Sequence, residues 1–402
     1  MEQKKRALII TDDPDSNQSY GIIANYIIES NQQYDWHVIS NQYQYGKPID
    51  RGTYWKWHSG LNQIERDQVV LPLVISKTKP EFVMTITDVD KLGYIHAVKD
   101  RNLPWINYFP IDNQDLRQLV LGKHNIELAD IAVTMSKFAY EFCKNYKIRV
   151  DAMIYPYVDT KMFRPFTNPE LKNQVLNFKQ RYGFEDKKVL LYVGRPGWRK
   201  NLEVLLGAFR KLCDKRDDVV LYLHTDFNDP AREFNFNKMM YAMDIPRDRL
   251  NRPNPKDMNW SIGLPQKLLA MLYNVADVYV TTHGGEGFGL PIAEAMATKV
   301  PFVATNTTTT EEFGWNSNKE WVRGFGADVK NWHSDRGVKR ALVDIDDFVK
   351  KVEILLDDDD LRKDMGKKVR DWVVKNCSVP VISRKWRKLF KRIDIGKAKI
   401  IE

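Results

Sequence analysis

Cysteine and long apolar runs are both scarce in this sequence. Its 402 residues include three cysteines, at positions 143, 213 and 377, which are widely spaced and lack a Cys-x-x-Cys partner. This pattern indicates neither a disulfide framework nor a zinc site, so we expect a reducing, cytoplasmic setting. The apolar run Ala7–Ile10 is too short for a signal-peptide core, and no stretch approaches the roughly 18 apolar residues of a membrane span. The sequence therefore predicts a soluble or peripheral protein.

Internal repeats are absent, and low-complexity tracts are confined to Thr307–Thr310 and Asp357–Asp360. The hydrophobic fraction of 43% and the charged fraction of 29% are those of an ordinary globular chain and exclude a wholly disordered one. At about 100–200 residues per domain, the length predicts two or three domains, each able to bury its own core.

Positive charge exceeds negative charge. The formal net charge is +9, which favours anionic partners such as nucleotide phosphates or anionic lipid surfaces. Basic residues gather between positions 367 and 392. A solvated helix face is the simpler interpretation of this cluster, and contact with membrane headgroups is the alternative.

Strand and helix patterns alternate along the chain, which is typical of parallel α/β architecture. The prolines between 156 and 169 then suggest a hinge, after which a second α/β series begins. We expect two Rossmann-like domains that face each other across a cleft: residues 1–165 on the acceptor side, residues 166–376 on the donor side, and a helical segment 377–402 that returns to the first domain. Strands are predicted at 7–11, 36–40, 82–87, 105–109, 131–134, 188–193, 219–224, 277–282 and 301–304, and helices at 21–30, 202–214, 265–273, 291–298, 346–356 and 360–375.

The most informative segment is the glycine-rich stretch 281–296. A buried strand ends, four glycines occupy six positions, and Pro291 suits the first turn of a helix. Glycines let the backbone approach a ligand closely, and the amides at the start of a helix bind anions such as a diphosphate. Glu294 is placed to accept hydrogen bonds from a ribose diol, and Glu286 to reach the sugar side of the same ligand.

A basic turn at residues 194–201 follows another predicted strand. Its Arg195 and Lys200 are candidates to neutralise a diphosphate, whereas Arg199 is interpreted as a solvated side chain. Charge-assisted hydrogen bonds contribute about 1.5–3 kcal/mol each, more than the roughly 0.3–1 kcal/mol of a helix terminus. Ligands of such sheets bind at the carboxyl ends of the strands, where both segments lie.

These residues resemble the motifs of retaining glycosyltransferase family 4. Glu286 and Glu294, with seven residues between them, resemble its E-x7-E motif, and Gly194-Arg195 with Lys200-Asn201 resembles its basic turn. Supporting similarities are found at residues 128–138, 158–165 and 273–277. The resemblance implies a GT-B fold, a nucleoside-diphosphate-sugar donor, most simply UDP- or GDP-linked, retention at the anomeric carbon, no obligatory metal and no further cofactor.

The resemblance also implies roles for individual residues. Arg195 and Lys200 would hold the diphosphate, Glu294 the ribose, and Glu286 the donor sugar. Backbone contacts to sugar and phosphate would come from Gly287, Phe288, Gly289 and Leu290, and Gly21 would lie in the N-terminal loop that faces the phosphates.

The N-terminal half departs from the family pattern, because its usual active-site histidine is not obvious. We assign that role to Asp112, which follows the predicted strand 105–109, and keep His96 as the other candidate. The acceptor is a glycan, a lipid or a protein, and peripheral membrane contact is compatible with any of these. No nucleic acid is expected.

Three other interpretations remain open. The acidic pairs at residues 88–90 and 13–15 are typical of metal-dependent glycosyltransferases of a different fold, although short acidic pairs are common in loops. A non-catalytic nucleic-acid- or membrane-binding protein would use the basic helices and the aromatic–basic stretch 54–58. A sugar-nucleotide epimerase on the same fold is the third.

Overall fold

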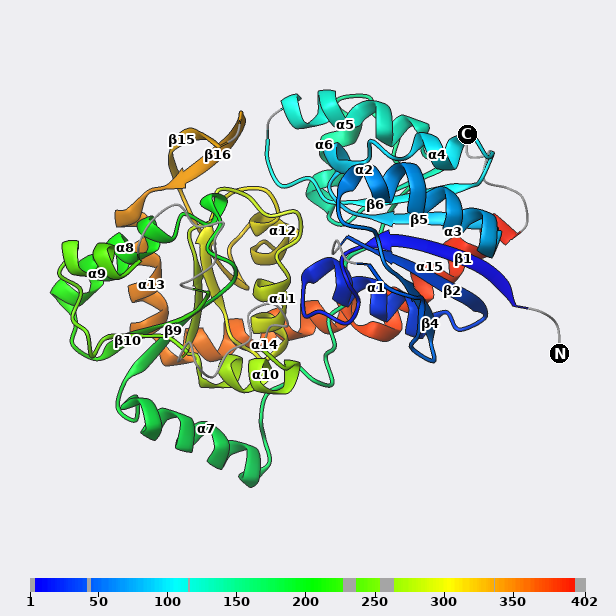
Figure 1. Ribbon diagram of the computed structural model, residues 1–402. Helices are drawn as coiled ribbons and strands as arrows, with labels where there is room; N and C mark the ends of the chain where they lie inside the picture. Colours follow the sequence, from blue (N-terminus) through cyan, green and yellow to red (C-terminus); the bar gives the residue numbers. More distant parts are fainter. Residues whose placement is uncertain are drawn as a thin grey trace.

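A computed structural model describes residues 4–41, 45–114, 116–226, 236–253, 264–335 and 337–394. Figure 1 shows two lobes, each built on its own sheet, with the N-terminal half of the chain in one lobe and most of the C-terminal half in the other. Within the described ranges, no helix combines the length and the apolar character that a membrane crossing requires.

The N-terminal lobe contains an eight-stranded sheet in the order β3-β4-β2-β1-β5-β6-β7-β8, parallel except for the β3–β4 pair. Its strands are β1 (Lys5–Thr11), β2 (Tyr34–Ser40), β3 (Ile49–Asp50), β4 (Tyr54–Trp57), β5 (Phe82–Ile86), β6 (Trp105–Phe109), β7 (Ile131–Thr134) and β8 (Ala152–Met153). Its helical segments are α1 (Ser19–Ser30), α2 (Gln63–Glu65), η1 (Arg66–Val70), α3 (Leu71–Thr78), η2 (Val89–Lys91), α4 (His96–Lys99), α5 (Leu116–Leu128) and α6 (Lys137–Asn145).

The C-terminal lobe contains a six-stranded parallel sheet in the order β11-β10-β9-β12-β13-β14 and a separate antiparallel hairpin, β15–β16. Its strands are β9 (Lys188–Val193), β10 (Val219–His224), β11 (Leu250–Asn251), β12 (Val278–Thr281), β13 (Phe302–Thr305), β14 (Gly324–Ala327), β15 (Val329–Asp335) and β16 (Val338–Val343). Its helical segments are α7 (Pro169–Tyr182), η3 (Trp198–Lys200), α8 (Leu202–Lys215), α9 (Phe236–Ala242), α10 (Gln266–Val275), α11 (Leu290–Ala297), α12 (Thr310–Gly314), α13 (Ile345–Asp357) and α14 (Asp359–Cys377).

The last helix, α15 (Val379–Asp394), leaves the C-terminal lobe and packs on the N-terminal one (Figure 1). The indole ring of Trp386 meets Tyr108 of β6 edge-on with ring centroids 4.9 Å apart, and Phe390 lies 5.6 Å from Phe82 of β5. Both C-terminal aromatic rings are fully buried. The final residues 395–402 of the segment predicted to return to the first domain lie outside the described residues.

The chain passes between the lobes at two neighbouring places. The amide of Val158 donates to the carbonyl of Cys377 at 2.9 Å, and Val158 forms a parallel bridge with Ser378. The first part of the predicted hinge is therefore packed into the protein, because Tyr155, Tyr157 and Val158 are buried. The more exposed part of the connection runs from Arg164 to Asn168.

Candidate donor site at the facing sheet edges

The glycine-rich loop joins β12 to α11 and touches the N-terminal lobe. A Cβ atom on Gly285 would lie 1.9 Å from the carbonyl oxygen of Asp112, and one on Gly287 would lie 2.3 Å from Cβ of Pro110. Gly289, the N-cap of α11, has φ of 94°, a conformation that side chains rarely adopt. The loop therefore requires glycine for its contact with the loop after β6 as well as for its turn into the helix.

Glu286 is buried in this loop and is paired with two cations of the basic turn. Its carboxylate accepts a hydrogen bond from Nη1 of Arg199 at 2.8 Å and another from Nζ of Lys200. Burial alone would raise the pKa of Glu286, but Arg199 and Lys200 outweigh it and hold that pKa well below its usual range. The two cations therefore favour the ionised form of Glu286, and its backbone is fixed by Thr308, whose hydroxyl accepts from the Glu286 amide at 2.9 Å.

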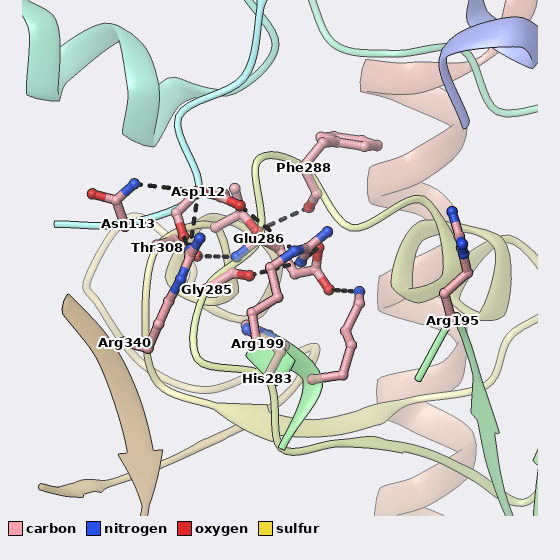
Figure 2. Close-up of polar contacts among 12 residues, drawn as sticks. Asp112, Asn113, Arg195, Arg199, His283, Gly285, Glu286, Phe288, Thr308 and Arg340 are labelled. Atoms are coloured by element: carbon pink, nitrogen blue, oxygen red, sulfur yellow. Dashed lines mark hydrogen bonds and ion pairs between the residues drawn. The ribbon is translucent and has the colours of Figure 1, made fainter. Parts of the chain in front are cut away.

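Arg199 is not the solvated side chain that the sequence suggested. Figure 2 shows its guanidinium between the glycine-rich loop and Asp112 of the N-terminal lobe. Its Nη1 also donates to the carbonyl of Gly285 at 3.0 Å, and its Nε lies 3.6 Å from Oδ2 of Asp112. The interpretation failed because these partners lie far away in the sequence; the only local signal was the neighbouring Lys200.

Asp112 lies at the carboxyl end of β6, where two arginines of the C-terminal lobe reach it. Besides Arg199, Arg340 of β16 places Nη1 at 3.0 Å from Oδ1 of Asp112 and 2.6 Å from its carbonyl oxygen. No motif marked Arg340, because its hairpin carries none of the family's sequence patterns. His96, the alternative candidate, is exposed at the start of α4, with its ring 6.4 Å from that of His124.

The other residues that the sequence predicted to bind the donor lie near the same sheet edges. Arg195 is exposed in the loop after β9 and acts electrostatically on Asp12, which follows β1. Gly21 lies in the first turn of α1, where a Cβ atom would be 2.2 Å from the carbonyl oxygen of Asp13. The start of α1 therefore packs directly under the loop after β1.

Glu294 is the fifth residue of α11, one position further into the helix than the predicted range 291–298 implied. Tyr273 donates its phenolic hydrogen to Oε2 at 2.8 Å. Burial raises the pKa of Glu294 to about 7, and the tyrosine bond offsets only part of that rise. Phe288 presents its carbonyl to the hydroxyl of Thr309 at 2.9 Å, and Leu290 begins α11.

The two acidic pairs are already engaged by cations. Asp88 accepts from Tyr20 and from Lys91, each at 2.6 Å. Lys56 of β4 binds both Asp13 and Asp15. In the part of the chain that the structure describes, no group of three or more potential metal-ligating side chains is found.

The aromatic–basic stretch 54–58 is a strand rather than a nucleic-acid-binding loop. It forms β4, in which Tyr54 and Lys56 are buried. The basic segment 367–392 likewise contributes to α14 and α15, whose inner faces pack on the two lobes while most of its lysines and arginines stay exposed. Neither feature favours the nucleic-acid interpretation.

Two Rossmann-like sheets whose carboxyl edges face each other, with a glycine-rich loop and a basic turn between them, define the GT-B class. Solved structures can be superposed on the chain over nearly its whole length. Sucrose-phosphate synthase from Thermosynechococcus elongatus aligns with a TM-score of 0.77 and 16% identity, over 98% of this chain and 100% of that one. Anabaena HepE, solved in complex with UDP-glucose, aligns with a TM-score of 0.73 and 12% identity, over 96% of this chain and 99% of that one. The chain therefore has a GT-B fold.

A family model matches most of the C-terminal lobe. Residues 175–372 match the family model described as glycosyl transferases group 1. This range holds the basic turn, the glycine-rich loop and Glu294, so the C-terminal lobe is similar to the glycosyl transferases of group 1 in the part that carries these motifs.

Curated relatives match part of the chain at low identity. Alpha-monoglucosyldiacylglycerol synthase of Streptococcus pneumoniae is 23% identical over 221 residues, which cover 53% of this chain and 46% of that protein. D-inositol 3-phosphate glycosyltransferase of Thermomonospora curvata is 31% identical over 157 residues, covering 38% of this chain and 35% of that protein. The aligned regions span less than half the length of these relatives.

Proposed function

We propose that the chain is a retaining glycosyltransferase of family 4 that transfers a sugar from a nucleoside-diphosphate sugar to an acceptor without a metal ion. The observation that carries this proposal is the convergence of the basic turn and the E-x7-E segment: Lys200 and Arg199 meet Glu286 in the loop, and Glu294 follows on the same segment, in α11. This arrangement lies at the carboxyl ends of β9 and β12, the position at which α/β sheets bind ligands.

The donor diphosphate would lie against Arg195, Lys200 and the amides at the start of α11. These groups are fixed before the reaction and supply positive potential where the leaving group gains negative charge. A metal would serve the same purpose, and the arginine and lysine side chains make one unnecessary in this proposal. Both Asp-x-Asp pairs, which a metal would need, already bind lysine.

Glu294 would accept hydrogen bonds from the two ribose hydroxyls, and Glu286 would orient the donor sugar while it neutralises the basic turn. The anomeric carbon gains cationic character as the diphosphate leaves, and the acceptor hydroxyl attacks on the face from which it departs, which preserves the configuration. Asp112 faces this point from the N-terminal lobe and is the residue that we assign to the acceptor side.

UDP-linked donors are the first to test, because the HepE structures were solved with UDP, with UDP and glucose, and with UDP-glucose. The pneumococcal relative is named after a glycolipid, and the Thermomonospora relative is named after a phosphorylated polyol. We therefore keep glycan, lipid and protein acceptors, and peripheral membrane contact, within the proposal.

The test is calorimetric titration with UDP, GDP, ADP and their common sugar conjugates in EDTA. We expect selective binding by the wild-type protein and at least tenfold weaker binding by Arg195→Ala and Glu294→Ala, about 1.4 kcal/mol each. Arg181→Ala, which removes an exposed arginine from the last turn of α7, is the matched control and should bind like wild type. Absence of binding to every nucleotide, or binding that both site variants leave unchanged, contradicts the proposal.

A further inference from the structure

Hairpin β15–β16 brings an arginine from the C-terminal lobe onto the backbone and the side chain of one N-terminal residue. Nη1 of Arg340 donates to the carbonyl oxygen of Asp112 at 2.6 Å and lies 3.0 Å from its carboxylate (Figure 2). The Arg340 side chain is only 8% exposed, so the pair is shielded from water. Shielded, charge-assisted hydrogen bonds are stronger than exposed ones and fix the geometry of both partners.

The hairpin is also tied to the glycine-rich loop. The amide of Ala341 donates to the carbonyl of Gly284 at 3.1 Å, and the side chain of Asn201 donates to the carbonyl of Ala341 at 3.0 Å. A Cβ atom on Gly284 would lie 2.9 Å from Cβ of Arg340. The backbone from which Arg340 extends is therefore held by the two segments proposed to bind the donor.

Asp112 is consequently enclosed by the donor side. Gly285 packs on its carbonyl oxygen, and Arg199 approaches its other carboxylate oxygen, Oδ2, at 3.6 Å. Arg199 also binds Glu286, so its position depends on the donor site, whereas Arg340 makes no bond to Glu286 among the contacts of the described residues. Besides Asp112, Arg340 approaches Asp335 of its own hairpin, with Nε 3.8 Å from Oδ2, so Asp112 is its carboxylate partner in the other lobe.

We propose that Arg340 is a positioning residue, which holds Asp112 against the glycine-rich loop and thereby keeps the acceptor-side and donor-side groups in one geometry. This inference rests on the proposed function, because it concerns the acceptor side of the same site. Arg340 acts through Asp112 and through the loop after β6; it does not itself hold the nucleotide. Loss of its bonds should slow turnover while donor binding remains.

The first test compares Arg340→Gln, Arg340→Lys and Asp112→Asn with Lys339→Gln, which removes the same charge from the adjacent, exposed position of β16. Hydrolysis of the nucleotide sugar, with water as acceptor, is measured as released nucleoside diphosphate. We expect Arg340→Gln to lower kcat at least tenfold and to change the donor KM less than twofold. Arg340→Lys should recover part of the loss, and Lys339→Gln should behave as wild type.

The double variant Arg340→Gln/Asp112→Asn separates positioning from a general effect on folding. If Arg340 acts through Asp112, the double variant should lose no more activity than the more impaired single variant. The inference would be overturned if the losses of activity of the two single variants multiplied in the double variant. An unchanged kcat in Arg340→Gln, or an effect of Arg340→Gln on the donor KM alone, would overturn it as well.

A second measurement does not depend on turnover. Hydrogen–deuterium exchange at residues 111–114 should be at least tenfold faster in Arg340→Gln than in wild type and unchanged in Lys339→Gln; unchanged exchange in Arg340→Gln would overturn the inference. Calorimetry on the same samples keeps the two proposals apart. Nucleotide binding with unaltered exchange contradicts the role of Arg340 alone, whereas a wild-type protein that binds no nucleotide contradicts the donor site.

Discussion

The two sheets meet at edges of opposite charge. On the N-terminal side, the loops after β1, β5 and β6 carry Asp12, Asp88 and Asp112. On the C-terminal side, the loop after β9 carries Arg195, Arg199 and Lys200, with Arg340 beside them and Glu286 as the carboxylate partner of two of them.

The aspartates of the N-terminal edge are neutralised in two different ways. Asp88 is paired within its own lobe by Tyr20 and Lys91, whereas Asp112 is paired by arginines of the other lobe. The C-terminal edge keeps an excess of cations, which is the property that a diphosphate requires. The comparison teaches that the basic edge has the charge that the proposed diphosphate donor needs, while the acidic edge offers hydrogen-bond acceptors and contacts the basic edge through Asp112.

Removing the carboxylate from the basic edge should have the largest effect. Glu286→Ala leaves the largely buried Lys200 and the part-buried Arg199 without their shared partner, so we expect a loss of about 3–5 kcal/mol in the free energy of unfolding. Urea denaturation measures it, with Glu185→Ala, an exposed glutamate before β9, as the control. A loss below about 1 kcal/mol would mean that water or other groups already compensate these cations.

Removing a cation from the N-terminal lobe should cost about 3 kcal/mol and leave nucleotide binding intact. Lys56 is 7% exposed and pairs with Asp13, which its removal would leave buried and uncompensated. Lys56→Ala should therefore lower stability, with nucleotide affinity within twofold of wild type, whereas the exposed Lys77→Ala should change neither. Weaker nucleotide binding in Lys56→Ala would contradict the division of roles between the two edges.

Nucleotide affinity should rise about tenfold between pH 6 and pH 8 because Glu294 ionises in that interval. Burial raises the pKa of Glu294 to about 7, and only the carboxylate accepts hydrogen bonds from both ribose hydroxyls. Glu294→Gln should bind more weakly and lose this dependence, and comparison of the two proteins separates it from titration of the nucleotide itself. Calorimetry across the range is the measurement, and identical pH profiles would rule out this role of Glu294.

The smallest effect should come from a carboxyl group that joins the lobes away from the donor site. Glu312 of α12 accepts hydrogen bonds from the amides of Lys137 and Phe138 at the start of α6, at 3.0 and 3.4 Å, and from Tyr155 at 2.8 Å. Burial raises its pKa to about 7, against the opposing effect of these bonds.

Since the folded protein holds the Glu312 proton more firmly than the unfolded chain, stability from this group is present below the usual pKa of about 4.5 and is lost as pH rises through about 7. The melting temperature of the wild-type protein should include a fall from this group as the pH rises over this interval. Glu312→Gln, which has no proton to lose there, should reduce that fall by a few degrees. The exposed Glu320→Gln is the control, and an unchanged slope in Glu312→Gln would show that Glu312 is already ionised at low pH.

The sequence was most informative where short apolar runs end in clear breaks. Strands β6, β7, β9 and β10 occupy the predicted residues, and the other predicted strands and helices differ by one or two residues at their ends. The hairpins β3–β4 and β15–β16 were missed, because β15 is largely exposed and β4 hides a lysine on its inner face. Their pairing depends on contacts that local patterns do not contain.

The same limit applies to the candidate site. Glycines and glutamates close together in the sequence led to the loop and to α11, but the environment of Arg199 and Arg340 depends on Asp112, which lies 228 residues before Arg340. A turn rich in arginine and lysine has the same sequence pattern whether it is solvated or buried between lobes. Only the folded arrangement of both sheets distinguishes these cases.

The packing of α15 on the first lobe has a consequence for the order in which the protein folds during synthesis. Trp386 and Phe390 are buried in one of the two core clusters of the N-terminal lobe, where they contact Phe82 of β5 and Tyr108 of β6. The ribosome makes the first lobe's strands early but supplies these two side chains only after the whole second lobe. The C-terminal lobe can therefore complete its core first, while the N-terminal lobe, although synthesised earlier, waits for residues near position 390.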